Sequence, residues 1–120
     1  MGLTKVTVEI SDLAKKRKPY ADQFLVDTGA IDCLAPASKL LKAGIKREGR
    51  SVYELADGTP VEYDYGFARV SFMGAETVAQ VIFGPENADP ILGVAALENT
   101  GIGVDPRSKM LLKMTAKALK

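Results

Sequence analysis

Apolar and polar residues alternate over several short stretches of the chain, which is the period of half-buried strands. Val6, Val8 and Ile10 show the alternation clearly, because Thr7 and Glu9 stand between them. Further strands are predicted at residues 20–26, 51–55, 60–65, 77–83, 101–104 and 109–114. Turn residues separate them at intervals of about 8–12 residues, which is typical of a mainly β fold.

The apolar residues change parity within the stretch that begins at Pro60. Val61 and Tyr63 occupy odd positions, whereas Val70 and Phe72 occupy even ones. A slip of one residue requires a bulge or a bend, and Gly66 is the position that permits it.

Two short helices are predicted between the strands. Residues 36–43 begin with a proline near the first turn and are followed by Gly44, and a second helical stretch covers residues 94–99. The tail, residues 115–120, is expected to be frayed or weakly helical. Together these elements predict one domain over residues 1–120, a mainly β, small closed β-barrel with one or two short helices.

The charge of the chain is nearly balanced, with 16 basic and 15 acidic residues and a net charge of +1. Such a balance predicts no nucleic-acid partner and no membrane surface. We interpret the basic run Lys15–Lys18 as a solvated loop, with a binding patch as the alternative. No apolar run reaches the length of a membrane span, and the N-terminus does not match a signal peptide, so we expect a cytoplasmic protein.

Histidine is absent and Cys33 is the only cysteine. These two facts exclude Ser-His-Asp and Cys-His catalysis and imidazole-based zinc sites. Cys33 is expected to be a small buried hydrophobe, because no histidine could activate it. No metal or organic cofactor is implied.

The segment Asp27-Thr28-Gly29 follows the apolar run Phe24-Leu25-Val26, so it places a carboxylate at a strand end before a glycine turn. Hydrolysis of peptide bonds by carboxylates requires two of them about 3 Å apart, sharing one proton. One chain supplies only one, so a homodimer with Asp27 on its two-fold axis would be needed, acting on a polypeptide substrate. The alternative is an acid that caps a turn after a buried strand.

Residues 24–30 resemble the active-site loop of the retropepsin-like aspartic proteases. The hairpin over residues 51–72 resembles the flap of that family, and Ile91-Leu92-Gly93 resembles the apolar-apolar-Gly segment beneath the active-site loop. The resemblance covers roughly residues 3–114. It implies a barrel of the acid-protease type and a homodimeric aspartic endopeptidase, in which Asp27 activates water while Thr28 and Gly29 hold the catalytic pair.

The resemblance also assigns the residues that contact substrate. Ala30 leaves room for the substrate backbone, and the hairpin tip would close over the bound peptide. The walls of the implied substrate cleft would be apolar, so we expect apolar substrate residues on either side of the cleaved bond. The predicted substrate-binding residues are Ala30, Ile31, Asp32, Leu55, Ala56, Asp57, Gly58 and Ile91. For Asp57-Gly58, an ordinary surface hairpin is the alternative.

Two positions depart from the family pattern. Ile31 stands where the family carries Asp, Ser or Thr, and Val94 stands where the retroviral members carry an Arg that pairs with that Asp. The simplest interpretation is an apolar contact in place of an ion pair. Asp32 is then a candidate for the lost substrate contact.

Two other functions are alternatives to the peptidase. Actin-like and sugar-kinase ATPases carry an Asp-x-Gly-x-Thr turn, but Ile31 replaces the hydroxyl and 120 residues are too few for two lobes around a nucleotide. The second alternative is a catalytically inactive retropepsin-like module for dimerisation or peptide binding, which Ile31 favours. Cleavage that is lost in Asp27→Asn would distinguish the enzyme from this module.

Overall fold

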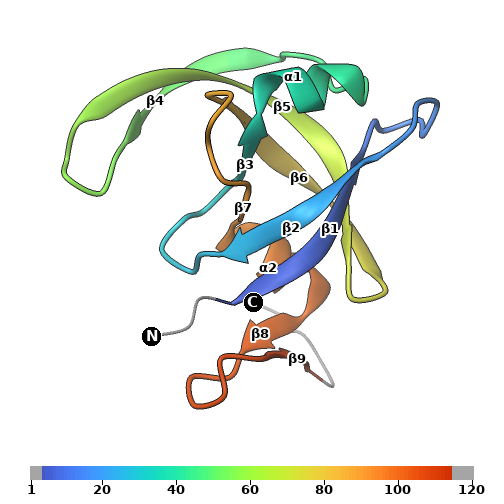
Figure 1. Ribbon diagram of the computed structural model, residues 1–120, viewed down its shortest axis with the longest axis vertical. Helices are drawn as coiled ribbons and strands as arrows, with labels where there is room; N and C mark the ends of the chain where they lie inside the picture. The colour runs from blue at the N-terminus through green and yellow to red at the C-terminus, as the bar shows by residue number, and fades with distance from the viewer. Residues whose placement is uncertain (1–3, 115–120) are drawn as a thin grey trace.

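The structure is a computed structural model that describes residues 4–114, and over that range it is mainly β with two short helices (Figure 1). In chain order the elements are β1 (Lys5–Ser11), β2 (Tyr20–Val26), β3 (Cys33–Pro36), α1 (Ala37–Lys42), β4 (Gly49–Glu54), β5 (Pro60–Phe72), β6 (Ala75–Gly84), β7 (Ile91–Leu92), α2 (Val94–Thr100), β8 (Ile102–Val104) and β9 (Leu111–Lys113). The prediction of a mainly β fold with short helices is confirmed.

The main sheet closes on itself. Its strand order is β1-β2-β7-β3-β6-β5-β4, and β1 also pairs with β5, for example at Ile10 and Val70. This second pairing joins β1, β2, β7, β3, β6 and β5 in a ring, so these strands leave few backbone groups unpaired. Strand β4 pairs only with the first half of β5 and extends beyond the ring as a hairpin (Figure 1).

The core consists of apolar side chains at alternate positions along the strands, which point to the inside of the ring. Val8, Ile10, Phe24, Val70 and Val81 are fully buried. Burial of each such side chain contributes about 1.5–3 kcal/mol. The two helices add further buried apolar side chains, among them Leu40, Ala96 and Leu97.

Strand β5 contains no bulge, so that part of the prediction at Gly66 is wrong. Its pairing with β6 runs without an inserted residue from Tyr65↔Ile82 through Gly66↔Val81. The long strand instead curves as it passes from β4 to its partners in the ring (Figure 1). The apolar parity changes because the second half faces the core and the first half does not. Gly66 has a different reason to be glycine, since a Cβ there would collide with the carbonyl oxygen of Lys46.

The remaining elements follow the sequence closely. The helix predicted at residues 36–43 is α1, and Gly44 after it has φ +89°. The predicted C-terminal hairpin is the antiparallel pair of β8 and β9. The expectation for residues 115–120 lies outside the described residues. Within residues 4–114, no helix has the length and apolar character to span a membrane.

Candidate functional site

Asp27 is the first residue after β2, and β7 fixes its backbone. Leu25 and Val26 pair in parallel with Ile91 and Leu92, and the N–H of Asp27 donates to the carbonyl of Leu92 at 3.1 Å. The N–H of Ala30 donates back to the carbonyl of Asp27 at 3.1 Å. The carboxylate is therefore carried on a tight turn at the end of a paired strand.

The Asp27 side chain is half-buried and is oriented by its own turn. The backbone N–H of Gly29 donates to Oδ1 of Asp27 at 2.9 Å. A Cβ at Gly29 would lie 3.2 Å from that oxygen, so glycine allows the amide to approach without crowding. Thr28 and Gly29 are exposed. One carboxylate oxygen is thus fixed at a turn that another molecule can reach.

The segment Ile91-Leu92-Gly93 supports this turn from below, as predicted. The N–H groups at the start of α2 hold the loop, since Val94 donates to Ala30 at 2.8 Å and Ala95 donates to Ile31 at 3.0 Å, each to the carbonyl. A Cβ at Gly93 would lie 2.5 Å from the carbonyl oxygen of Ile31. Only glycine permits this approach of two backbone segments.

Ile31 projects away from the core, with 70% of its surface exposed. Val94 is half-buried in the next element. The expected apolar contact between them would therefore leave most of Ile31 in water. What joins the two segments is the backbone hydrogen bonding described above.

Asp32 lies in a polar cluster that the sequence did not reveal. Nε2 of Gln80 donates to Oδ2 of Asp32 at 3.1 Å and to the hydroxyl of Tyr53 at 3.4 Å. Burial raises the pKa of the Asp32 carboxyl above its ordinary value. Gln80 is a polar residue between the buried residues Ala79 and Val81, in the half of β6 whose other residues are apolar. A polar residue at this position was the one feature of the sequence that could have indicated the polar cluster.

The hairpin tip predicted to act as a flap makes its own hydrogen bonds. The N–H of Leu55 donates to the carbonyl of Thr59 at 2.9 Å, and the N–H of Gly58 donates to the carbonyl of Leu55 at 2.8 Å. Hydrogen bonds from the side chain of Thr59 and from its backbone N–H, the latter at 2.9 Å, lower the pKa of Asp57. Gly58 has φ +87°, a conformation that glycine adopts without strain.

The predicted site residues fall into two groups. Residues 27–32 form one cluster with Ile91, which lies half-buried between β2 and β3. Leu55, Ala56, Asp57 and Gly58 form the other group, exposed at the tip of the hairpin. Both groups project to the same side of the molecule, at the left of Figure 1. Tyr53, which lies in β4 just before the tip, and Gln80 link the hairpin to Asp32.

Cys33 is buried at the start of β3, and burial raises the pKa of its thiol to about 11. The thiol is therefore protonated at neutral pH, as expected of a small buried hydrophobe. Across the described residues, no group of three or more Asp, Glu or Cys side chains is arranged to hold a metal ion.

Comparison with known proteins assigns no family: no protein-family model matches the chain, and a search of curated proteins finds no match.

Proposed function

We propose that the chain is one subunit of a homodimeric aspartic endopeptidase with a retropepsin-type barrel. The observation that carries the proposal is the setting of Asp27. Its carboxylate stands at an exposed turn, is oriented by the N–H of Gly29 and is supported from below by Gly93. A loop built in this way can present a carboxylate to its counterpart in a second copy.

The chemistry requires both copies of Asp27. Two carboxylates about 3 Å apart cannot both ionise, so one stays protonated and the other acts as a base. The base takes a proton from a water held between them, and the acid protonates the carbonyl oxygen of the substrate as the water attacks. The Thr28 hydroxyl is free to hydrogen-bond across the two-fold axis, because it is exposed next to Asp27.

The exposed apolar side chains support the assignment of a peptide substrate. Ile31 is 70% exposed beside Asp27, and Leu55 is 44% exposed at the hairpin tip. Both would lose water when an extended peptide binds between the loop and the hairpin. We expect apolar residues on either side of the cleaved bond, and a cleavage profile dominated by charged residues would contradict this.

The C-terminal hairpin offers a surface for self-association. Met110, Leu112 and Met114 are all exposed, and β8 and β9 form a sheet of only two strands. A two-stranded sheet with exposed apolar side chains gains stability when further strands or a second surface cover it. This feature supports a dimer but does not depend on catalysis.

The same fold could serve as a catalytically inactive module for dimerisation or peptide binding. Ile31 is the observation that favours this alternative, because an exposed isoleucine cannot give the hydrogen bonds that Asp, Ser or Thr would give to a substrate backbone. Asp32 can still accept hydrogen bonds from a substrate backbone, because Gln80 occupies only one of the acceptor sites of its carboxylate.

The test compares the protein with Asp27→Asn, which preserves the shape of the side chain and removes its charge. Both proteins are incubated with an unfolded protein and a peptide library at several pH values from acidic to neutral. The proposal expects cleavage by the unmodified protein and none by Asp27→Asn. Equal inactivity of the two folded proteins over that range would leave the binding module as the function.

A further inference from the structure

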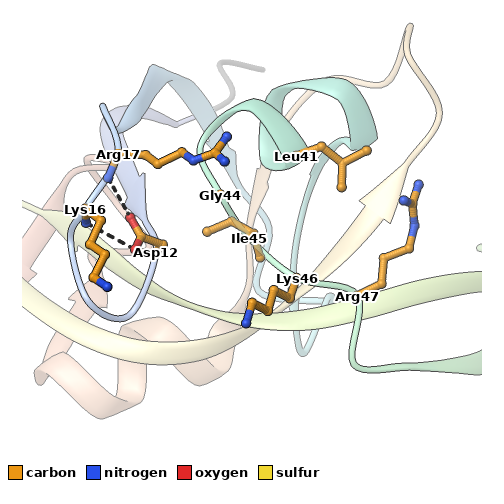
Figure 2. Close-up of a pocket in the computed structure, with 8 residues that line it drawn as sticks. All are labelled: Asp12, Lys16, Arg17, Leu41, Gly44, Ile45, Lys46 and Arg47. Carbon is orange, nitrogen blue, oxygen red and sulfur yellow. Dashed lines mark hydrogen bonds between the residues drawn. The ribbon is translucent and has the colours of Figure 1, made fainter.

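A hollow of about 610 Å³ lies between the loop that joins β1 to β2 and the segment that follows α1 (Figure 2). None of the residues predicted for the peptidase site lines it. Four basic side chains do: Lys16 and Arg17 come from the loop, and Lys46 and Arg47 come from the segment before β4. The fold thus brings a second basic pair beside the run that the sequence suggested was only a solvated loop.

The basic end of the loop has a fixed backbone. The carboxylate of Asp12 accepts the N–H groups of Lys16 and Arg17, each at 3.1 Å (Figure 2). The carbonyl of Asp12 accepts the N–H of Lys15 at 2.9 Å. An aspartate that binds backbone amides a few residues further on stabilises a turn. The two cations are therefore presented by an ordered turn.

Arg17 is also packed against the opposite side of the hollow. Gly44 has φ +89°, and a Cβ there would lie 3.2 Å from both Cγ and Cδ of Arg17. The aliphatic part of Arg17 therefore lies on the glycine, and its guanidinium extends toward α1 (Figure 2). Lys16 and Lys46 project to one side of the hollow, at the bottom of Figure 2.

Of the four cations, only Arg47 forms a salt bridge within the described residues, and the Asp12 carboxylate at the same hollow also attracts Arg17. Arg47 pairs with Asp64 at 2.7 Å and lies over the ring of Phe83. Among the described residues, Lys16, Arg17 and Lys46 form no ion pair. Cations gathered at one hollow repel one another and raise the local concentration of anions. An anionic ligand would relieve that repulsion.

We propose that this hollow binds an acidic stretch of polypeptide, with carboxylates on the basic side chains and an apolar residue against Leu41. Lys and Arg bind carboxylates through charge-assisted hydrogen bonds. Leu41 is 41% exposed at the wall of the hollow, above the buried Ile45, which suits an apolar side chain better than a phosphate. No aromatic residue lines the hollow, so a nucleic-acid base would have nothing on which to stack. The proposal does not depend on peptidase activity.

The test measures the fluorescence anisotropy of a labelled peptide with the repeated sequence Glu-Glu-Leu at low salt. Lys16→Gln/Lys46→Gln removes two of the unpaired cations, and Lys5→Gln/Lys113→Gln removes two exposed cations in β1 and β9 that do not line the hollow. We expect the first variant to bind about ten-fold more weakly than the unmodified protein and the control to bind within about two-fold of it.

Two comparisons sharpen the result. The peptide with Gln in place of Glu should not bind, and amide resonances of residues 16, 17, 45 and 46 should shift when the acidic peptide is added. Thermal unfolding of each variant verifies its fold. Equal weakening in both variants, no binding by the unmodified protein, or tighter binding of an oligonucleotide of equal charge would overturn the proposal.

Discussion

Gly93 is the residue on which the shape of the Asp27 loop depends most directly. Its φ of −86° suits any residue, so only space requires glycine here. A Cβ would lie 2.5 Å from the carbonyl oxygen of Ile31 and closer still to that of Asp32, and these backbone atoms cannot move without displacing the loop.

We expect Gly93→Ala to lower the free energy of unfolding by about 1–3 kcal/mol, because overpacking against backbone forces a local shift. The matched control is Gly103→Ala, where the nearest atom is the terminal methyl of Met114, which can rotate away. Urea unfolding of the two variants measures the difference. Equal stabilities would mean that the contact beneath the loop is not tight.

The raised pKa of Asp32 predicts the direction in which the stability of the folded protein changes with pH. Burial raises its pKa in the folded state above the ordinary value of 3.8. The folded protein then binds the proton more tightly than the unfolded chain, so stability falls as pH rises from about 3.8 through the raised pKa and stays lower above it.

The variant Asp32→Asn lacks this titration. We expect the stability of Asp32→Asn minus that of the unmodified protein to increase with pH over that window and then to level off. Acids whose pKa is lowered, such as Asp12 and Glu76, lose stability toward low pH in both proteins and cancel in the difference. Chemical denaturation at a series of pH values measures it, and a difference that is flat or decreases with pH contradicts the assignment.

The hairpin made by β4 and the first half of β5 extends outside the ring of strands. Its tip is held by hydrogen bonds within residues 55–59, and its turn residue Gly58 has φ +87°. Gly74, in the turn between β5 and β6, has φ +77° but joins two strands of the ring. The two glycines therefore have similar positive φ values, one at the tip of the hairpin outside the ring and the other between two strands of the ring.

Alanine at either position costs about 1 kcal/mol, because a left-handed conformation strains any residue with a Cβ. We expect Gly58→Ala to accelerate hydrogen exchange of the Leu55 and Gly58 amides about five-fold without changing the melting temperature, since the tip opens below the global unfolding energy. Gly74→Ala should lower the melting temperature instead. Equal effects on melting would mean that the hairpin unfolds together with the ring.

The strands were predictable because each has its own alternation, and turn residues mark their ends. Tyr20–Val26 reads the same in sequence and structure. The closure of the ring was harder to predict from the sequence, because it depends on Glu9 pairing with Ser71, which is far away along the chain. The bulge that was one of the two possibilities at Gly66 is absent for a related reason: the side of β5 that is buried depends on which strands surround it, and local alternation does not carry that information.

The candidate site, like the fold, was predictable only in its local parts. The loop of residues 27–32 and its support by Gly93 are local or follow from a motif, so the sequence located them. The link from Asp32 through Gln80 to Tyr53 joins three distant segments, and nothing in their spacing indicates it. The same holds for the meeting of Lys16 and Lys46, which is a product of the fold as a whole.

At the scale of the whole molecule, the proposed activity requires two chains to share one site. A chain that carries Asp27→Asn still presents Thr28, Gly29 and the exposed side chains of β9, so it should pair with an unmodified chain. The mixed dimer then has one carboxylate instead of two and cannot divide the roles of acid and base.

Mixing the two proteins therefore tests the shared site. If subunits exchange freely, an equal mixture should retain about one quarter of the activity of the same total amount of unmodified protein, because only dimers of two unmodified chains are active. A site within one chain would retain about one half. The control is Asp27→Asn combined with Leu112→Asp, which places a charge on the exposed apolar surface of β9; it should not pair, so adding it leaves the activity of the unmodified protein unchanged. Activity that declines in proportion to the fraction of unmodified chain would contradict a site made by two copies of Asp27.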